Sequence, residues 1–171
     1  MKRKILYLLL VIINISILTG CNETTEQKLE TNISESINID DNGAALVCTT
    51  DYDYTELKYV LGSKYVVFAD DNGKVTKVVS REIISSTDET KLDEFESYLN
   101  ENHTAALQYN GYTYDVKRED TQVISDVTID YGEFDIKKFA SENEDADIDG
   151  ELTVDSIETK YVSLGAKCER K

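Results

Sequence analysis

An acidic stretch near the C-terminal end has residue types and a spacing that suit calcium. It is Asp145-Ala146-Asp147-Ile148-Asp149-Gly150-Glu151-Leu152. An EF-hand-type loop has carboxylates at positions 1, 3 and 5, a glycine at 6 and a backbone carbonyl ligand at 7, and the stretch fits each of these. The predicted calcium ligands are therefore Asp145, Asp147, Asp149 and the carbonyl of Glu151.

The match ends at position 12, which should supply a bidentate Glu but is Ser156 here. The segment before Asp145 also lacks the apolar spacing of an entering helix. A solvated acidic loop that precedes a helix is the alternative interpretation, and the missing ligand favours it. No other cofactor is indicated.

No catalytic residue can be named from the sequence. The single histidine, His103, ends a predicted helix, where a cation would suit the helix dipole. Neither Cys48 nor Cys168 lies in a nucleophile motif with which this histidine could act. There is no Gly-x-Ser-x-Gly, P-loop or Cys-x-x-Cys, and no acid–base pair stands out among 34 Asp and Glu. We expect a chain that is not an enzyme.

The first residues are typical of a lipoprotein signal. Met1–Lys4 is basic, residues 5–18 are almost wholly apolar, and Leu18-Thr19-Gly20-Cys21 looks like a bacterial lipobox. Such a lipobox implies cleavage of residues 1–20 and attachment of lipid, such as palmitate, to Cys21. An uncleaved transmembrane anchor is the alternative, but no basic stop-transfer run follows the short apolar stretch.

With Cys21 assigned to the lipid, Cys48 and Cys168 remain as a pair. A disulfide is the default for two cysteines in a secreted, oxidising setting. Cys48 lies near the start of the predicted folded part and Cys168 near its end. The bond would therefore join the first element of the domain to the last.

The net charge of −16 limits the partners of this chain. Nucleic acid is not expected, since phosphate contacts need clustered Lys and Arg. Anionic headgroups would repel the acidic surface, so the lipid would have to provide the membrane contact. The expected partners are the membrane, through the lipid anchor, and an unknown envelope protein or ligand.

Hydrophobic spacing predicts a tether over residues 21–43 and a single domain over residues 44–171. The tether is polar and acidic, with isolated aliphatic residues. Period-two alternation predicts strands, and three-and-four spacing predicts helices. The predicted strands are 44–52, 57–61, 64–69, 74–84, 112–117, 123–131 and 166–169, and the predicted helices are 87–103, 135–142 and 153–164.

Strands with one wet face and amphipathic helices predict an α+β domain: an antiparallel sheet with two helices packed on one face. Asn72-Gly73 and Asn110-Gly111 are the expected turns. The eleven tyrosines suit strands that pack a core, and the alternative is a glycan- or peptide-binding surface.

The chain resembles the YehR-like group of small bacterial lipoproteins. The resemblance rests on the lipobox at Cys21 and on three segments between Lys64 and the C-terminus: Asp71–Lys77, Val127–Tyr131 and Tyr161–Cys168. It implies an α+β lipoprotein domain, and it brings no catalytic residues.

These observations predict a lipid-anchored binding or interaction domain on the extracytoplasmic face of a bacterial cell membrane. Two alternatives stay open. One is a calcium-binding envelope lipoprotein that uses the acidic loop, and the other is an envelope enzyme whose catalytic residues the sequence does not reveal.

Overall fold

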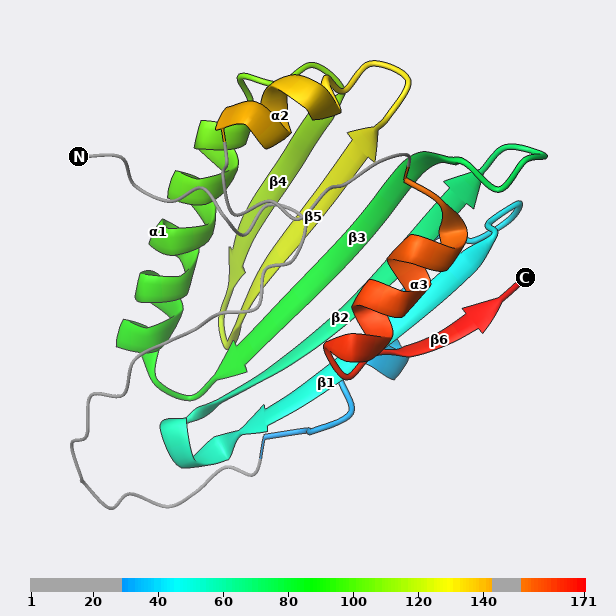
Figure 1. Ribbon diagram of the computed structural model, residues 1–171. Coiled ribbons are helices and arrows are strands. Elements are labelled where there is room, and N and C mark those ends of the chain that lie inside the picture. Colours follow the sequence, from blue (N-terminus) through cyan, green and yellow to red (C-terminus); the bar gives the residue numbers. More distant parts are fainter. Residues whose placement is uncertain (1–28, 143–151) are drawn as a thin grey trace.

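The computed structural model describes residues 29–142 and 152–171. Its strands form one six-stranded sheet in the order β4-β5-β3-β2-β1-β6, with every neighbouring pair antiparallel (Figure 1). The elements in chain order are the 3₁₀ turn η1 (Ser34–Ser36), β1 (Leu46–Tyr54), the 3₁₀ turn η2 (Thr55–Leu57), β2 (Tyr59–Ala69), β3 (Val75–Ser86), α1 (Glu89–Ala106), β4 (Tyr112–Glu119), β5 (Gln122–Asp130), α2 (Ile136–Glu142), α3 (Val154–Ser163) and β6 (Lys167–Arg170). The predicted α+β class is confirmed.

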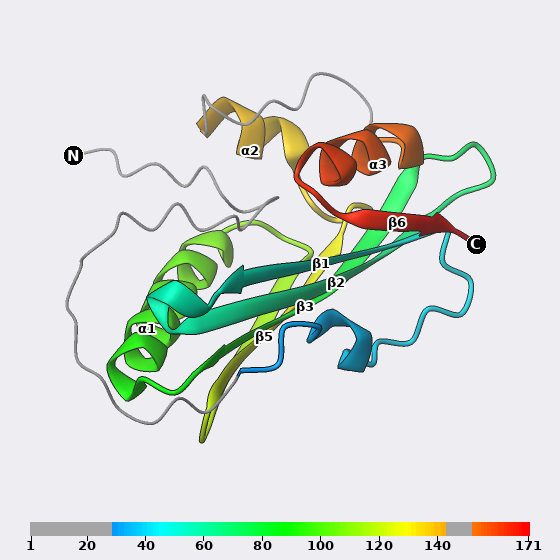
Figure 2. The ribbon, with the colours of Figure 1, turned by 90° about the horizontal axis from the view of Figure 1, so that it is seen from below.

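The three helices lie on one side of the sheet, and the segment around η1 lies on the other (Figure 2). Apolar clusters fill the space beneath the helices. One joins α3 to β1–β3 through residues such as Leu46, Val78 and Ile157. A second joins α1 to the sheet through residues such as Ile84 and Phe95. A third lies where α2 and the end of α1 meet β4 and β5, and contains Ala106, Tyr109, Tyr112, Ile129, Phe134 and Phe139.

A side chain caps the start of α1. The carboxylate of Asp88 accepts the N–H of Thr90 at 3.1 Å. Ser86 ends β3, where its hydroxyl donates to the carbonyl of Lys58 at 2.6 Å and accepts the N–H of Asp88. The helix therefore begins at Glu89 and continues to Ala106, three residues beyond its predicted end.

The second face of the sheet is covered in part by the chain that precedes β1. Ile33 and Ile37 are 6% and 4% exposed and pack against Val60 and Ile83. The N–H and the hydroxyl of Ser34 both donate to the Asp51 carboxylate. The prediction of a flexible tether is therefore wrong for residues 29–43. Their isolated aliphatic side chains are buried because the sheet offers an apolar patch that the segment cannot provide by itself.

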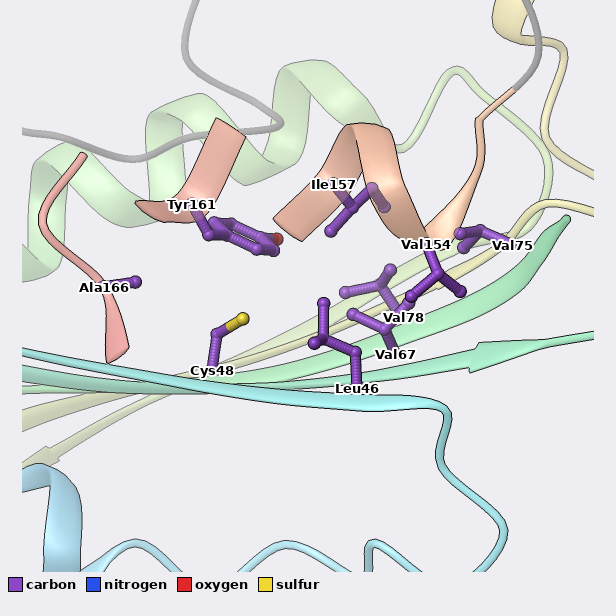
Figure 3. Close-up of a cluster of buried hydrophobic side chains, with 9 residues drawn as sticks. All are labelled: Leu46, Cys48, Val67, Val75, Val78, Val154, Ile157, Tyr161 and Ala166. Atoms are coloured by element: carbon purple, nitrogen blue, oxygen red, sulfur yellow. The ribbon is translucent and has the colours of Figure 1, made fainter. Parts of the chain in front are cut away.

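The disulfide is confirmed. Cys48 and Cys168 are directly opposed on β1 and β6, with their Cα atoms 4.1 Å apart and their sulfur atoms bonded at 2.04 Å. Cys48 is fully buried in the cluster beneath α3, beside Leu46 and Ala166 (Figure 3). The bond therefore holds a four-residue edge strand, and the helix before it, against the sheet.

No helix among residues 29–142 and 152–171 is both long enough and apolar enough to cross a membrane.

Candidate functional site

A row of polar side chains crosses the helix-covered face of the sheet, where an apolar core would be expected. Thr50 of β1 is opposed to Ser63 of β2, Ser63 to Glu82 of β3, and Glu82 to Ser125 of β5. We call these four residues, with His103 of α1, the buried polar row. All five are less than 9% exposed. The row lies on the same face as the three apolar clusters described above.

Glu82 is the only acidic member of the row. It is 6% exposed, and its Oε1 accepts hydrogen bonds from Ser63 Oγ at 3.4 Å and from Tyr65 Oη at 3.3 Å. Burial raises the pKa of Glu82 to about 7, and these two long hydrogen bonds offset that rise only in part. Glu82 therefore changes its charge close to neutral pH.

His103 connects α1 to the sheet through both of its ring nitrogens. Nδ1 lies 2.6 Å from Tyr112 Oη, and Nε2 lies 2.9 Å from Ser125 Oγ. Burial lowers the pKa of His103 to about 4, so the ring is neutral at pH 7. A neutral imidazole has one donor and one acceptor, and each is used here. The interpretation of His103 as a cation at the helix end is therefore wrong.

Tyrosine side chains surround the carboxylate of Glu82. Burial raises the pKa of Tyr52, Tyr65, Tyr112 and Tyr161, and the negative charge of Glu82 raises each of them further. The rings of Tyr65 and Tyr161 are stacked with their centroids 4.5 Å apart, so α3 also contributes to this region. The four hydroxyls stay protonated at neutral pH and can act as hydrogen-bond donors.

Two hydroxyls on this face are buried without a hydrogen-bond partner, namely Thr50 Oγ1 and Tyr131 Oη. Thr50 is 8% exposed and lies beside Ser63, the donor to Glu82. Tyr131 packs against both the cluster beneath α3 and the cluster beneath α2. A buried hydroxyl without a partner costs about 1–3 kcal/mol, so a ligand atom that satisfied it would be stabilised.

The sequence did not single out Glu82 as a site residue. The signal was the alternation of β3, in which Glu82 shares a face with Val78 and Ile84, both of them buried. His103 likewise continues the buried stripe of α1 that includes Leu92, Phe95 and Leu99. What the sequence could not supply was the register that aligns Thr50, Ser63, Glu82 and Ser125 on four strands.

The predicted lipid and calcium sites are not tested by the structure. Cys21, Asp145, Asp147, Asp149 and Glu151 lie outside the described residues. Among residues 29–142 and 152–171, no three His, Cys, Asp or Glu side chains are grouped so that they could hold a metal ion.

Ser156 occupies position 12 of the calcium pattern, and its side chain helps to cap the N-terminus of α3. Thr153 Oγ1 accepts the N–H of Ser156 at 3.2 Å, and Ser156 Oγ accepts the N–H of Thr153 at 3.0 Å. This reciprocal cap fixes the first turn of α3.

The chemistry available in the buried polar row is that of a carboxylate among neutral donors. Glu82 can hold a proton or a cation, while His103 and the tyrosines can only exchange hydrogen bonds near neutral pH. Ser125 Oγ lies beside the neutral ring of His103, which also contacts Tyr112. The row therefore offers positions for a proton, a cation and hydrogen bonds.

No protein-family model and no curated protein matches the chain. Among solved structures, the chain is similar to the NMR structure of the E. coli YehR protein, a structural genomics target. That similarity has 17% sequence identity and a TM-score of 0.49, and covers 72% of this chain and 90% of that one. It is also similar to the NMR structure of a protein from Streptococcus pneumoniae TIGR4, with 14% identity and a TM-score of 0.43 over 90% of this chain and all of that one. No function follows from similarities of this degree.

Proposed function

We propose that this chain is a non-catalytic binding domain that a lipid on Cys21 holds at the extracytoplasmic face of a bacterial membrane. The N-terminal sequence supports the location, since a basic start, a short apolar stretch and Leu18-Thr19-Gly20 precede Cys21. The Cys48–Cys168 disulfide supports it independently, because such bonds persist in oxidising compartments.

The observation that supports binding is the buried polar row itself. It contains a carboxylate that titrates near neutral pH and a buried threonine hydroxyl with no partner. Apolar residues at Thr50, Ser63 and Glu82 would stabilise the fold better, because desolvated polar groups cost free energy unless they are fully paired. We infer that these residues are kept for a ligand that completes their hydrogen bonds.

Cell fractionation tests the location. The wild-type chain should be found with membranes and should lose residues 1–20. Cys21→Ser should either release the protein from membranes or leave the signal uncut, whereas Cys48→Ala should leave its membrane attachment unchanged. Unchanged processing and unchanged membrane retention of Cys21→Ser would overturn the lipid anchor.

Binding is tested by NMR on the chain from position 21 with Cys21→Ser, a form that contains every described residue. Amide shifts are followed during separate titrations with methylammonium, acetate, phosphate and glucose at constant ionic strength. At least one probe should shift the amides of residues 63, 82 and 125, and its binding should be lost in Glu82→Gln and weakened in Thr50→Val. If no probe acts on these amides, the buried polar row is a structural feature and not a binding site.

A further inference from the structure

We propose that the buried polar row binds a protonated amine, with the carboxylate of Glu82 as its counter-ion. This inference rests on the proposed binding function and names the class of ligand for that site. It is carried by the charge of the site, by its unused hydrogen-bond capacity and by the aromatic side chains around it.

The charge of Glu82 favours a cationic ligand. None of the described cationic side chains forms an ion pair with Glu82. Within the described part of the chain, the only groups that stabilise its ionised form are two neutral hydroxyls, those of Tyr65 and Ser63. Arg81 is adjacent in sequence but lies on the opposite face of β3, where it pairs with Asp126 through bonds of 2.6 and 2.8 Å. An ionised Glu82 is therefore an uncompensated buried charge, and a ligand that brings a positive charge would gain the most from it.

The hydrogen-bonding groups of the row suit an ammonium group. An ammonium group has three N–H donors and no acceptor. The row offers acceptors in matching positions: the carboxylate of Glu82, whose present bonds are long, the hydroxyl of Ser63, and the unpartnered hydroxyl of Thr50. These three residues are consecutive neighbours across β3, β2 and β1. A primary amine could therefore satisfy Glu82 and Thr50 together.

Tyrosine side chains lie near the carboxylate of Glu82. The rings of Tyr65 and Tyr161 stack at 4.5 Å, and both hydroxyls are close enough to Glu82 to feel its charge. Their hydroxyl oxygens can accept N–H donors of an ammonium group bound beside Glu82. An anion would meet only repulsion from Glu82. A calcium ion would find one carboxylate where it normally takes several oxygen ligands, and the described residues contain no group of three His, Cys, Asp or Glu side chains that could hold a metal ion.

Only Glu82 changes its charge at this site between pH 5 and pH 8. The hydroxyls of Tyr52 on β1, Tyr65 on β2, Tyr112 on β4 and Tyr161 on α3 all have a raised pKa and stay neutral. His103 on α1 has a pKa of about 4 and stays neutral as well. Since the pKa of Glu82 is about 7, the fraction of it that is ionised rises by about 100-fold over this range.

The experiment titrates the Cys21→Ser chain from position 21 with methylammonium chloride, against sodium chloride at equal ionic strength. Methylammonium should shift the amides of residues 50, 63, 82 and 125, and its affinity should rise by about 100-fold from pH 5 to pH 8. Glu82→Gln should abolish both the binding and its pH dependence. Thr50→Val should weaken binding by about 10-fold and keep the pH dependence, because the counter-ion remains.

Two variants serve as controls, and both should bind as the wild type does. Ser85→Ala removes another buried hydroxyl without a partner, but from the opposite face of β3. Glu133→Gln removes an exposed carboxylate. If Glu82→Gln fails to fold, the pH dependence of the wild type and the Thr50→Val variant still decide the question.

The outcomes separate the two proposals. If acetate or glucose binds at residues 63, 82 and 125 and methylammonium does not, the amine is wrong and the binding function stands. If sodium causes the same shifts as methylammonium, the site binds cations without selecting for an amine, and the inference is overturned. If none of the probes binds there, the proposed function and this inference fail together.

Discussion

Glu82 and Ser125 are directly opposed on β3 and β5, and the hydroxyl of Ser125 lies 2.9 Å from Nε2 of His103. One serine therefore stands between the buried acid and the buried base of this domain. Burial moves their two pKa values in opposite directions, to about 7 for Glu82 and to about 4 for His103. The pH dependence of stability should therefore have two opposing parts.

Glu82 should make the domain less stable as the pH rises. Its pKa is about 7 in the folded state against 4.5 ordinarily, so between these values the folded state holds a proton that the unfolded chain has lost. Its contribution is fully present below pH 4.5 and is lost as the pH rises through 7. The shift corresponds to about 3 kcal/mol. Urea unfolding should show Glu82→Gln to be the more stable form at pH 8 by up to this amount and nearly equal to the wild type at pH 5. An equal difference at both pH values would contradict the buried acid.

His103 should make the domain less stable as the pH falls. Its pKa is about 4 in the folded state against 6.5 ordinarily, so the unfolded chain takes up a proton first and stability is lost between these values. His103→Gln removes the titrating group and leaves an amide that can hydrogen-bond. Circular dichroism during acid titration should show a shallower loss of structure from pH 6.5 to pH 4 in the variant. An unchanged slope would mean that His103 is not the group responsible.

Removal of the disulfide should cost a large part of the stability. The bond closes a loop between residues 120 positions apart, which corresponds to about 5 kcal/mol in the chain-entropy model. The double variant Cys48→Ala, Cys168→Ala should therefore unfold at a much lower urea concentration, and a reducing agent should have the same effect on the wild type but none on the variant. A difference below about 1 kcal/mol would show that β6 is held by its packing alone.

Gly62 should be essential for the contact between the N-terminal segment and the sheet. A Cβ at this position would lie 2.6 Å from the Cβ of Ile33 and 2.8 Å from the backbone N of Ser34. Since real atoms do not approach so closely, Gly62→Ala should displace the turn at residues 34–36 and expose residues 29–41 to proteases. Limited proteolysis with mass spectrometry measures this. Glu35→Ala, an exposed change on the same turn, is the control and should leave the cleavage pattern unchanged.

The sequence by itself determined the local elements and the cross-link. Period-two alternation located the strands, except that the predicted strands 57–61 and 64–69 are parts of the single strand β2, and three-and-four spacing located the helices. Asp70-Asp71-Asn72-Gly73 marked the β2–β3 turn, where Gly73 has φ +78°. Each of these signals is local, because it depends on which face of one element is apolar. The disulfide followed from counting, since the predicted lipid attachment at Cys21 left Cys48 and Cys168 as the expected pair.

The tertiary structure decided where the polar residues meet. Thr50, Ser63, Glu82 and Ser125 are ordinary polar residues in their own strands, and the register between four strands places them side by side. The same holds for the partners of His103, which lie 9 and 22 residues away in sequence. Residues 29–43 also depend on the tertiary structure. Their few aliphatic side chains bury too little surface to order this segment alone, but they can be buried against a face of the sheet. In each case, the outcome depends on long-range pairing, which no local sequence pattern encodes.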